Sequence, residues 1–213
     1  MSTTLLLRKL RIENREFVTS DELRNYCKPL KANYEAVIRY FIKKGYLQRV
    51  FKGIFYVPSL EELKLGRKRY NHLELVAKGL ELKKVDDWYF GLHTALKLNN
   101  MTHEHFSMDE VVSGVLFRAK PVRIAGHVFR FIKLSPSLLG FGVVETKGIR
   151  YSDAEKTVLD FAYLWRYNGV PIEKIVADLS DWARISSRKK LTKYALRYPS
   201  TVRRAIEGVP VSK

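Results

Sequence analysis

The stretch that decides the fold spans residues 17–58 and reads FVTSDELRNYCKPLKANYEAVIRYFIKKGYLQRVFKGIFYVP. Thr19 and Glu22 have the spacing of a capping box, so a helix is expected to begin directly after Thr19. That helix should end before Pro29, because proline disfavours helical geometry in the residue that precedes it. The first part of the stretch therefore predicts one short, capped helix.

The rest of the stretch predicts a second helix and a hairpin. Asn33 is placed to cap this helix, and Gly45 would end it in a left-handed conformation. An apolar face runs along the helix and consists of Val37, Ile38, Phe41 and Ile42. Two strand-like runs, 46–50 and 54–57, then flank a tight turn.

An amphipathic segment at about residues 4–14 precedes this stretch, with Leu6, Leu7 and Leu10 at helical spacing. Three helices followed by a hairpin form a winged helix-turn-helix, whose third helix lies in the DNA major groove. We therefore expect residues 1–58 to be a winged helix-turn-helix DNA-binding domain.

Charge supports this interpretation. Residues 1–57 contain 12 Lys and Arg against 5 Asp and Glu, a net charge of +7. Neutralisation of phosphates dominates DNA affinity, so a small basic unit of this kind suits a duplex. The alternative is a protein-binding domain surrounded by solvated charges.

Eight residues on the third helix and the hairpin are expected to contact DNA: Lys31, Asn33, Tyr34, Arg39, Tyr40, Lys43, Arg49 and Lys52. Asn33 and Arg39 are the expected base readers, because Asn pairs well with adenine and Arg with guanine. Arg49 and Lys52 would hold phosphates. The spacing of Tyr34 from Val37 also fits a position in the core.

The whole chain shares the basic character. Its 213 residues carry a formal charge of +17 with a pI near 9.9, which favours acidic partners such as nucleic acid. A membrane is the poorer partner, because no apolar run approaches the roughly 20 residues that span a bilayer and no signal-peptide pattern is present. Cys27 is the only cysteine, which fits a reducing cytoplasm.

The remaining residues predict an α+β domain. Residues 59–84 read as a helix interrupted at Gly66, either a linker or the first helix of a second domain. Within residues 85–213, strand-like segments lie at 111–117, 122–124, 128–134 and 143–146, and helices follow from Ser152 onward. Ser152 and Glu155 have capping-box spacing at the start of these helices. The expected domain is a small sheet with carboxy-terminal helices.

Candidate catalytic and metal-binding groups are sparse. His103, Glu104 and His105 lack further ligands nearby, and a polar loop explains them better than a zinc site. His93 is expected to be a satisfied core or interface residue. Gly140 and Gly142 are not followed by the Lys-Ser/Thr of a phosphate-binding loop. We therefore expect a protein that is not an enzyme and that has no catalytic residue, metal or cofactor.

A second basic region lies near the carboxy terminus. Residues 184–204 contain eight basic residues and no acidic one: Arg184, Arg188, Lys189, Lys190, Lys193, Arg197, Arg203 and Arg204. Solvated helix faces usually mix charges of both signs. Two uses therefore remain open, an extension of the DNA-binding surface or a docking surface for an acidic protein, with the DNA use slightly favoured.

Three segments resemble the AbiEi-type antitoxin and transcriptional regulator family. Residues 45–58 (GYLQRVFKGIFYVP) resemble its winged helix, and residues 89–96 (YFGLHTAL) resemble the helix that opens its second domain. Residues 149–160 (IRYSDAEKTVLD) are similar to a helix start that contains Asp-Pro-Glu-Lys in the family, with Ala154 in place of the proline.

The resemblance implies a regulator of a type IV toxin–antitoxin system. Such a protein represses its own operon through the winged helix, and its carboxy-terminal domain counteracts a nucleotidyltransferase toxin. The partners implied are double-stranded operator DNA and that toxin. Stand-alone relatives leave open a winged-helix transcription regulator, or a protein-interaction adaptor, without a toxin partner.

Overall fold

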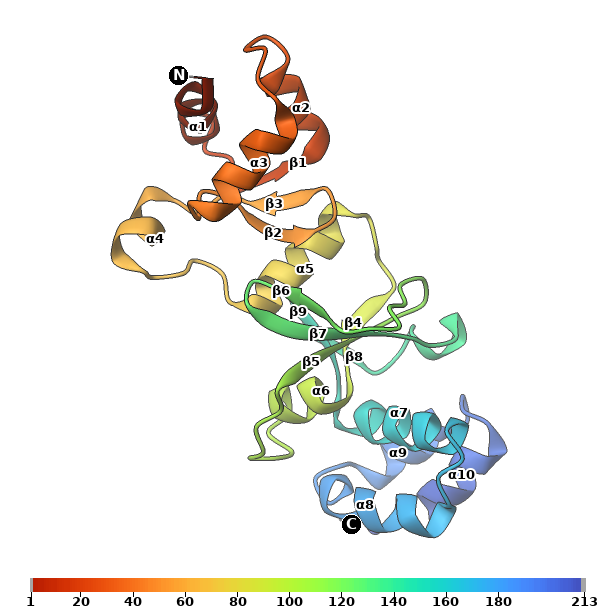
Figure 1. The fold of residues 1–213 in the computed structure, drawn as a ribbon. Coiled ribbons are helices and arrows are strands. Elements are labelled where there is room, and N and C mark those ends of the chain that lie inside the picture. Colours follow the sequence, from red (N-terminus) through yellow and green to blue (C-terminus); the bar gives the residue numbers. More distant parts are fainter. Residues whose placement is uncertain (1, 212–213) are drawn as a thin grey trace. The chain divides into compact units, whose positions relative to one another are not determined.

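The computed structural model describes residues 2–211, which form ten α-helices and two β-sheets (Figure 1). The chain is thus of the α+β class, as predicted. It divides into two compact units. Unit 1 comprises the residues through Lys84 together with Ile124–Gly126, and unit 2 comprises Val85–Arg123 and the residues from His127 onward.

Unit 1 begins with three helices and a three-stranded antiparallel sheet. Its elements are α1 (Ser2–Ile12), β1 (Phe17–Thr19), α2 (Ser20–Cys27), α3 (Tyr34–Lys43), β2 (Gln48–Phe51) and β3 (Ile54–Tyr56). The strand order is β1-β3-β2. The sequence did not predict β1, because three residues are too few to show an alternating pattern. Pairing with β3, in which Phe17 lies opposite Tyr56, defines this strand.

The helix ends follow the predicted caps. Thr19 and Glu22 form the capping box of α2, and the Asn33 side chain accepts a hydrogen bond from the Ala36 backbone at the start of α3. Both predictions are confirmed. Gly45 adopts a φ of 74° directly after the end of α3, the left-handed conformation that was expected there.

A core in unit 1 joins α1, α2 and α3 to the sheet and includes Leu6, Leu10, Leu23, Val37, Ile38, Phe41 and Phe55. The apolar face of α3 is narrower than predicted, because Ile42 is 37% exposed. A helix turns about 100° per residue, so the neighbour of the fully buried Phe41 lies beyond the edge of the buried face.

Residues 59–84 form two helices, α4 (Leu60–Leu65) and α5 (His72–Leu82), and the interruption begins at Gly66, as the sequence indicated, and extends through residue 71. Both lie in unit 1. The α5 helix packs against β2 at Gly79, where an added Cβ would lie 2.6 Å from the Phe51 ring. The α5 helix therefore packs against the β2–β3 hairpin.

Unit 2 contains a six-stranded mixed sheet in the order β6-β7-β5-β4-β9-β8. Its strands are β4 (Trp88–Phe90), β5 (Met108–Ser113), β6 (Val122–Ile124), β7 (His127–Lys133), β8 (Val143–Thr146) and β9 (Ile149–Ser152). The sheet is larger than predicted, since β4 and β9 were not recognised as strands. Residues 88–90 are all buried, so this strand shows no alternation of apolar and polar residues.

One predicted strand is also shorter than expected. The segment 115–117 lies outside β5, and Val115 and Phe117 are 65% and 58% exposed. Apolar composition alone therefore extended the predicted strand beyond the residues that pair.

Further along the chain, a short 3₁₀ helix (Pro136–Leu138) precedes β8.

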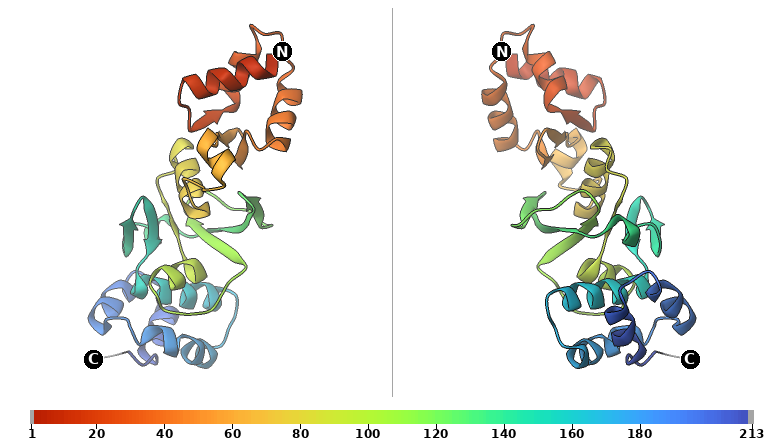
Figure 2. Two further views of the ribbon diagram at one scale, coloured as in Figure 1. Left: turned by 90° about the vertical axis from the view of Figure 1, so that its left-hand side faces the viewer. Right: turned by 90° about the vertical axis from the view of Figure 1, so that its right-hand side faces the viewer.

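The helices of unit 2 are α6 (Leu92–Leu98), α7 (Ala154–Tyr167), α8 (Ile172–Ala183), α9 (Arg188–Ala195) and α10 (Ser200–Glu207). The last four gather into one bundle (Figure 2) and match the helices predicted from Ser152 onward. The predicted capping box at Ser152 is wrong, because Ser152 belongs to β9. Asp153 instead caps α7 by accepting a hydrogen bond from the Lys156 backbone.

A buried ionic network holds α7 inside unit 2. Lys156 and Asp160 are fully buried, and their side chains form an ion pair of 3.0 Å. Lys156 also donates to the Leu138 carbonyl and to the Tyr198 hydroxyl, while the hydroxyls of Tyr89 and Tyr198 donate to Asp160 at 2.7 Å. Such a pair is tolerated in a core because hydrogen bonds satisfy both charges.

Candidate nucleic-acid interface

The α3 helix presents a polar face opposite the face that it buries. Val37, Ile38 and Phe41 are at most 3% exposed, whereas Arg39 and Lys43 are exposed. Tyr40 is 43% exposed and lies with them, one helical turn before Lys43. A face with two cations and one aromatic ring can form hydrogen bonds with base edges or phosphates.

Tyr34 lies at the junction of α2 and α3. Its hydroxyl donates to Ser20 Oγ at 2.8 Å, and the Arg24 guanidinium lies 4.6 Å from the centre of its ring. Arg24 in turn pairs with Asp21 at 3.2 Å. Tyr34 is half-buried, and through these contacts it orients α3 relative to α2. The sequence had allowed either a core position or a DNA-facing position for this residue.

Asn33 is the N-cap residue of α3. Its Oδ1 accepts a hydrogen bond of 3.0 Å from the Ala36 backbone, while the residue itself is exposed. Pairing with adenine uses the amide oxygen and nitrogen of Asn together. Asn33 therefore offers its Nδ2 donor to a base, and bidentate pairing would require it to give up the cap.

Arg39 has more freedom than Asn33. Its Nε donates to the Glu35 carbonyl at 3.4 Å, which is long for such a bond. The terminal guanidinium nitrogens make no hydrogen bond or ion pair to any residue in the range 2–211. Lys31 is exposed in the turn before α3, where its φ of 48° lies in the left-handed region.

The β2–β3 hairpin carries two cations, and a third that the sequence did not predict lies beside it. Arg49 is exposed and lies 5.4 Å from the centre of the Phe55 ring, and Lys52 is exposed in the turn next to Gly53. Lys83, at the end of α5, donates to the Lys52 carbonyl at 3.5 Å. Lys83 is distant from the hairpin in sequence, so only the packing of α5 against β2 brings it there.

The second basic region divides into two groups. Four of its residues make contacts within unit 2: Arg184 with Asp181, Arg188 with the carbonyls of Ile206 and Val209, Lys190 with Asp153 and Glu155, and Arg197 with the Phe141 ring. The other four are exposed and are here named the α9–α10 cations: Lys189, Lys193, Arg203 and Arg204.

Lys190 joins α9 to the start of α7. Its Nζ lies 2.7 Å from Asp153 and 3.0 Å from Glu155. Partial burial alone would lower the pKa of Lys190, but hydrogen bonds to these two carboxylates raise it above its ordinary value. Burial likewise favours a higher pKa for Glu155, and hydrogen bonds from the Ser187 backbone and Lys190 lower it overall. This pair stabilises the helix bundle.

The other residues that the sequence analysis considered for catalysis or metal binding lie in a polar loop or have structural roles. His103, Glu104 and His105 are exposed in the irregular segment between α6 and β5, which confirms a polar loop. His93 Nδ1 lies 2.9 Å from Glu110, and its ring contacts Phe106 and Phe161, as expected for a satisfied histidine. Gly142 packs against α7, since an added Cβ would lie 2.8 Å from that of Lys156.

Comparison with known proteins adds information on the fold. Neither a protein-family model nor a curated protein sequence matches the chain. The crystal structure of the RV2827C protein from Mycobacterium tuberculosis is similar, with a TM-score of 0.59 and 15% sequence identity over 98% of this chain and 76% of that chain. Similarity at this level of identity shows a shared fold alone.

Membrane insertion through a helix can be assessed from the described part of the chain. In residues 2–211, none of the helices combines the length and the apolar character that crossing a bilayer requires.

Proposed function

We propose that this protein is a sequence-specific DNA-binding transcriptional repressor whose amino-terminal part is a winged helix-turn-helix. The order α1-β1-α2-α3-β2-β3 and the pairing β1-β3-β2 support this assignment. The observation that carries the proposal is the polar face of α3, where Arg39, Tyr40 and Lys43 are exposed opposite a fully apolar face. In this class of domain, the third helix reads the major groove.

The hairpin would then act as the wing. Arg49, Lys52 and Lys83 present three cations there, and lysine and arginine side chains at such positions neutralise phosphates and fix the register of the protein on the duplex. Base reading is assigned chiefly to Arg39, because Asn33 uses its amide oxygen in the helix cap.

A role as the antitoxin of a type IV toxin–antitoxin system follows from the resemblance of residues 45–58, 89–96 and 149–160 to the AbiEi-type family. In that role the protein would act in the cytoplasm, repress its own operon and counteract a nucleotidyltransferase toxin. The alternative is a stand-alone transcription regulator, or an adaptor that binds protein. Neither role assigns a catalytic step to the chain.

One observation favours a protein partner for the second basic region. Leu196 is 67% exposed and lies between Lys193 and Arg197, and Ile185 is 57% exposed in the same region. Large apolar side chains among cations suit an acidic protein surface better than a phosphate backbone. This observation fits the antitoxin role and the adaptor role equally.

The decisive experiment compares two duplexes by fluorescence anisotropy, the DNA upstream of the protein's own gene and a random sequence of equal length. Arg39→Ala should weaken binding to the upstream duplex by about 1–3 kcal/mol and leave the random duplex nearly unaffected. Arg8→Ala, which removes an exposed arginine from α1, is the matched control and should leave the ratio of the two affinities unchanged. Equal losses on both duplexes with Arg39→Ala would reduce Arg39 to a phosphate contact, and no duplex binding by the unaltered protein would refute the proposal.

A further inference from the structure

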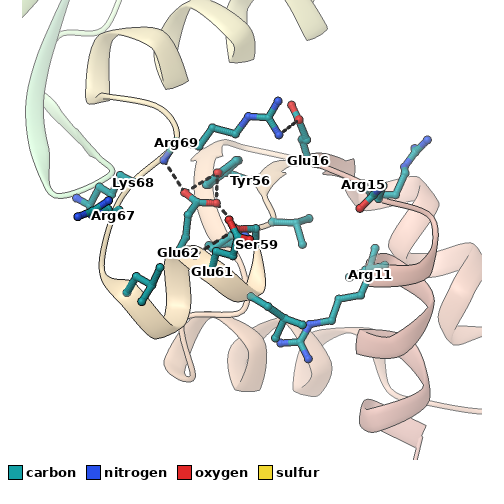
Figure 3. A pocket seen from close by; sticks show the side chains of 16 residues that line it. Arg11, Arg15, Glu16, Tyr56, Ser59, Glu61, Glu62, Arg67, Lys68 and Arg69 are labelled. Carbon is teal, nitrogen blue, oxygen red and sulfur yellow. Dashed lines mark hydrogen bonds and ion pairs between the residues drawn. The ribbon is translucent and has the colours of Figure 1, made fainter.

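Unit 1 contains a pocket of about 800 Å³ that the proposed DNA contacts do not use. It lies beside the end of α1, the end of β3 and the α4 helix (Figure 3). A volume of this size is typical of sites for small organic molecules. We infer that this pocket binds an amphiphilic organic anion, a small molecule with an apolar body and a carboxylate, sulfonate or phosphate group.

The apolar part of the pocket results from the way α4 is held. None of the residues of α4 is buried, and its leucines Leu60, Leu63 and Leu65 are 48%, 39% and 67% exposed. Leu60 and Leu65 line the pocket. Clustered exposed apolar side chains mark binding sites more often than single ones do, and an apolar ligand body would cover the two at the pocket.

Polar bonds, in place of apolar packing, fix the position of α4. Glu62 accepts hydrogen bonds from the Tyr56 hydroxyl and from the backbone of Ser59 and Arg69, and Figure 3 shows these three converging on its carboxylate. Burial alone would raise the pKa of Glu62, but these hydrogen bonds lower it overall, so the carboxylate stays ionised at neutral pH. The pocket wall is therefore held in place while its leucines remain uncovered.

The charges around the pocket favour an anion. Its lining contains five basic and three acidic side chains. Arg15 pairs with Glu22 and Arg69 pairs with Glu16, but Arg11, Arg67 and Lys68 form no ion pair with any residue in the range 2–211.

These three cations lie on two sides of the pocket. Figure 3 shows Arg11 on the α1 side, and Arg67 and Lys68 on the other side, beyond the end of α4. Glu61 lies among them as an acidic residue of the rim, so the excess of positive charge is modest. An anionic group at the rim would meet that excess while its apolar body contacts Leu60 and Leu65.

The test uses the full chain and two fluorescent probes with the same aromatic body. The probe 1-anilinonaphthalene-8-sulfonate carries a sulfonate, and N-phenyl-1-naphthylamine lacks it. We expect saturable binding of the sulfonate probe, weakened about five- to tenfold by the double substitution Arg67→Gln/Lys68→Gln, since two charge contacts from exposed side chains are lost. The neutral probe should bind more weakly and should not respond to that change. Leu65→Ser should weaken both probes.

Several controls make the outcome decisive. Lys189→Gln/Lys193→Gln removes two exposed lysines from unit 2 and should leave the affinity for both probes unchanged. Thermal unfolding checks that each variant is folded. Equal affinity of the sulfonate probe for the unaltered protein and for both pocket variants would overturn the inference. Self-association that Leu65→Ser abolishes in sedimentation velocity would also overturn it, because a second copy of the chain would then cover the pocket.

This inference goes beyond the proposed function and is tested separately from it. Probe binding is measured without DNA, and Arg39→Ala should leave it unchanged because Arg39 lies outside the lining of the pocket. A protein that binds no duplex but binds the sulfonate probe in the expected pattern would refute only the proposed function.

Discussion

Lys52 and Lys83 provide a quantitative test of the hairpin as a phosphate-binding wing. The two lysines lie at the same turn, where Lys83 Nζ is 3.5 Å from the Lys52 carbonyl. Replacing both with Ala removes two cations from one place without touching the core, since both side chains are exposed. The perturbation is therefore expected to act on DNA binding and not on folding.

The magnitude follows from the number of cations on the candidate interface. Arg39 is assigned to a base, which leaves five cations for phosphates: Lys31, Lys43, Arg49, Lys52 and Lys83. Each neutralised phosphate makes the slope of log affinity against log salt more negative by about 0.9, so the unaltered protein, with five such contacts, should show a slope of about −4.5. The double variant should show about −2.7.

The assay is fluorescence anisotropy with a random duplex between 50 and 200 mM salt. Affinity of the unaltered protein should fall about 500-fold over this range, and that of the double variant about 40-fold. Lys64→Ala/Lys78→Ala, which removes two exposed lysines from α4 and α5, is the control and should keep the original slope. An unchanged slope in Lys52→Ala/Lys83→Ala would show that these two lysines do not contact phosphate.

Three further predictions concern unit 2. Lys156→Met should lower the free energy of unfolding by about 3–5 kcal/mol in urea titrations, because it leaves the buried Asp160 carboxylate without its cation; a loss below about 1 kcal/mol would contradict this. The lowered pKa of Glu155 gives stability that is present above about pH 4.3, its unfolded value, and is lost as pH falls through the folded pKa. Lys190→Gln should therefore lose less stability than the unaltered protein between pH 7 and pH 3, and an equal loss would exclude the pair as the cause. Changing all four α9–α10 cations to Glu should leave the DNA salt slope unchanged if this surface docks protein, and a slope reduced by two units or more would assign it to DNA.

The local signals in unit 1 could be predicted from the sequence because they depend on neighbouring residues. The caps at Thr19 and Asn33 each join a side chain to a backbone N–H three positions away, and Gly45 adopts the left-handed conformation because it has no Cβ. Strand β1 could not be predicted in the same way, since its three residues become a strand only by pairing with β3.

Contacts between distant segments account for the rest. Lys83 reaches the hairpin only through the packing of α5. Lys190 lies in a uniformly basic stretch of the sequence, but in the structure it pairs with Asp153 and Glu155, which are distant along the chain. Lys156 offers the clearest case: in the sequence it is one more lysine, and in the structure it is fully buried. Charge counts along the chain describe composition, and they cannot tell a solvated cation from one that is part of the core.

Gly79 has a consequence for anyone who wishes to engineer a more heat-resistant form of this protein. A glycine inside a helix is the usual first choice for replacement by alanine, which gains roughly 1 kcal/mol of helix propensity. Here the added methyl carbon would lie 2.6 Å from the Phe51 ring and 2.7 Å from Val50, and overpacking of that kind costs about 1–3 kcal/mol. Because both neighbours belong to β2, the strain would move the hairpin. A substitution chosen to raise thermal stability would thus alter the surface proposed to hold DNA, although Gly79 is not one of the proposed DNA contacts.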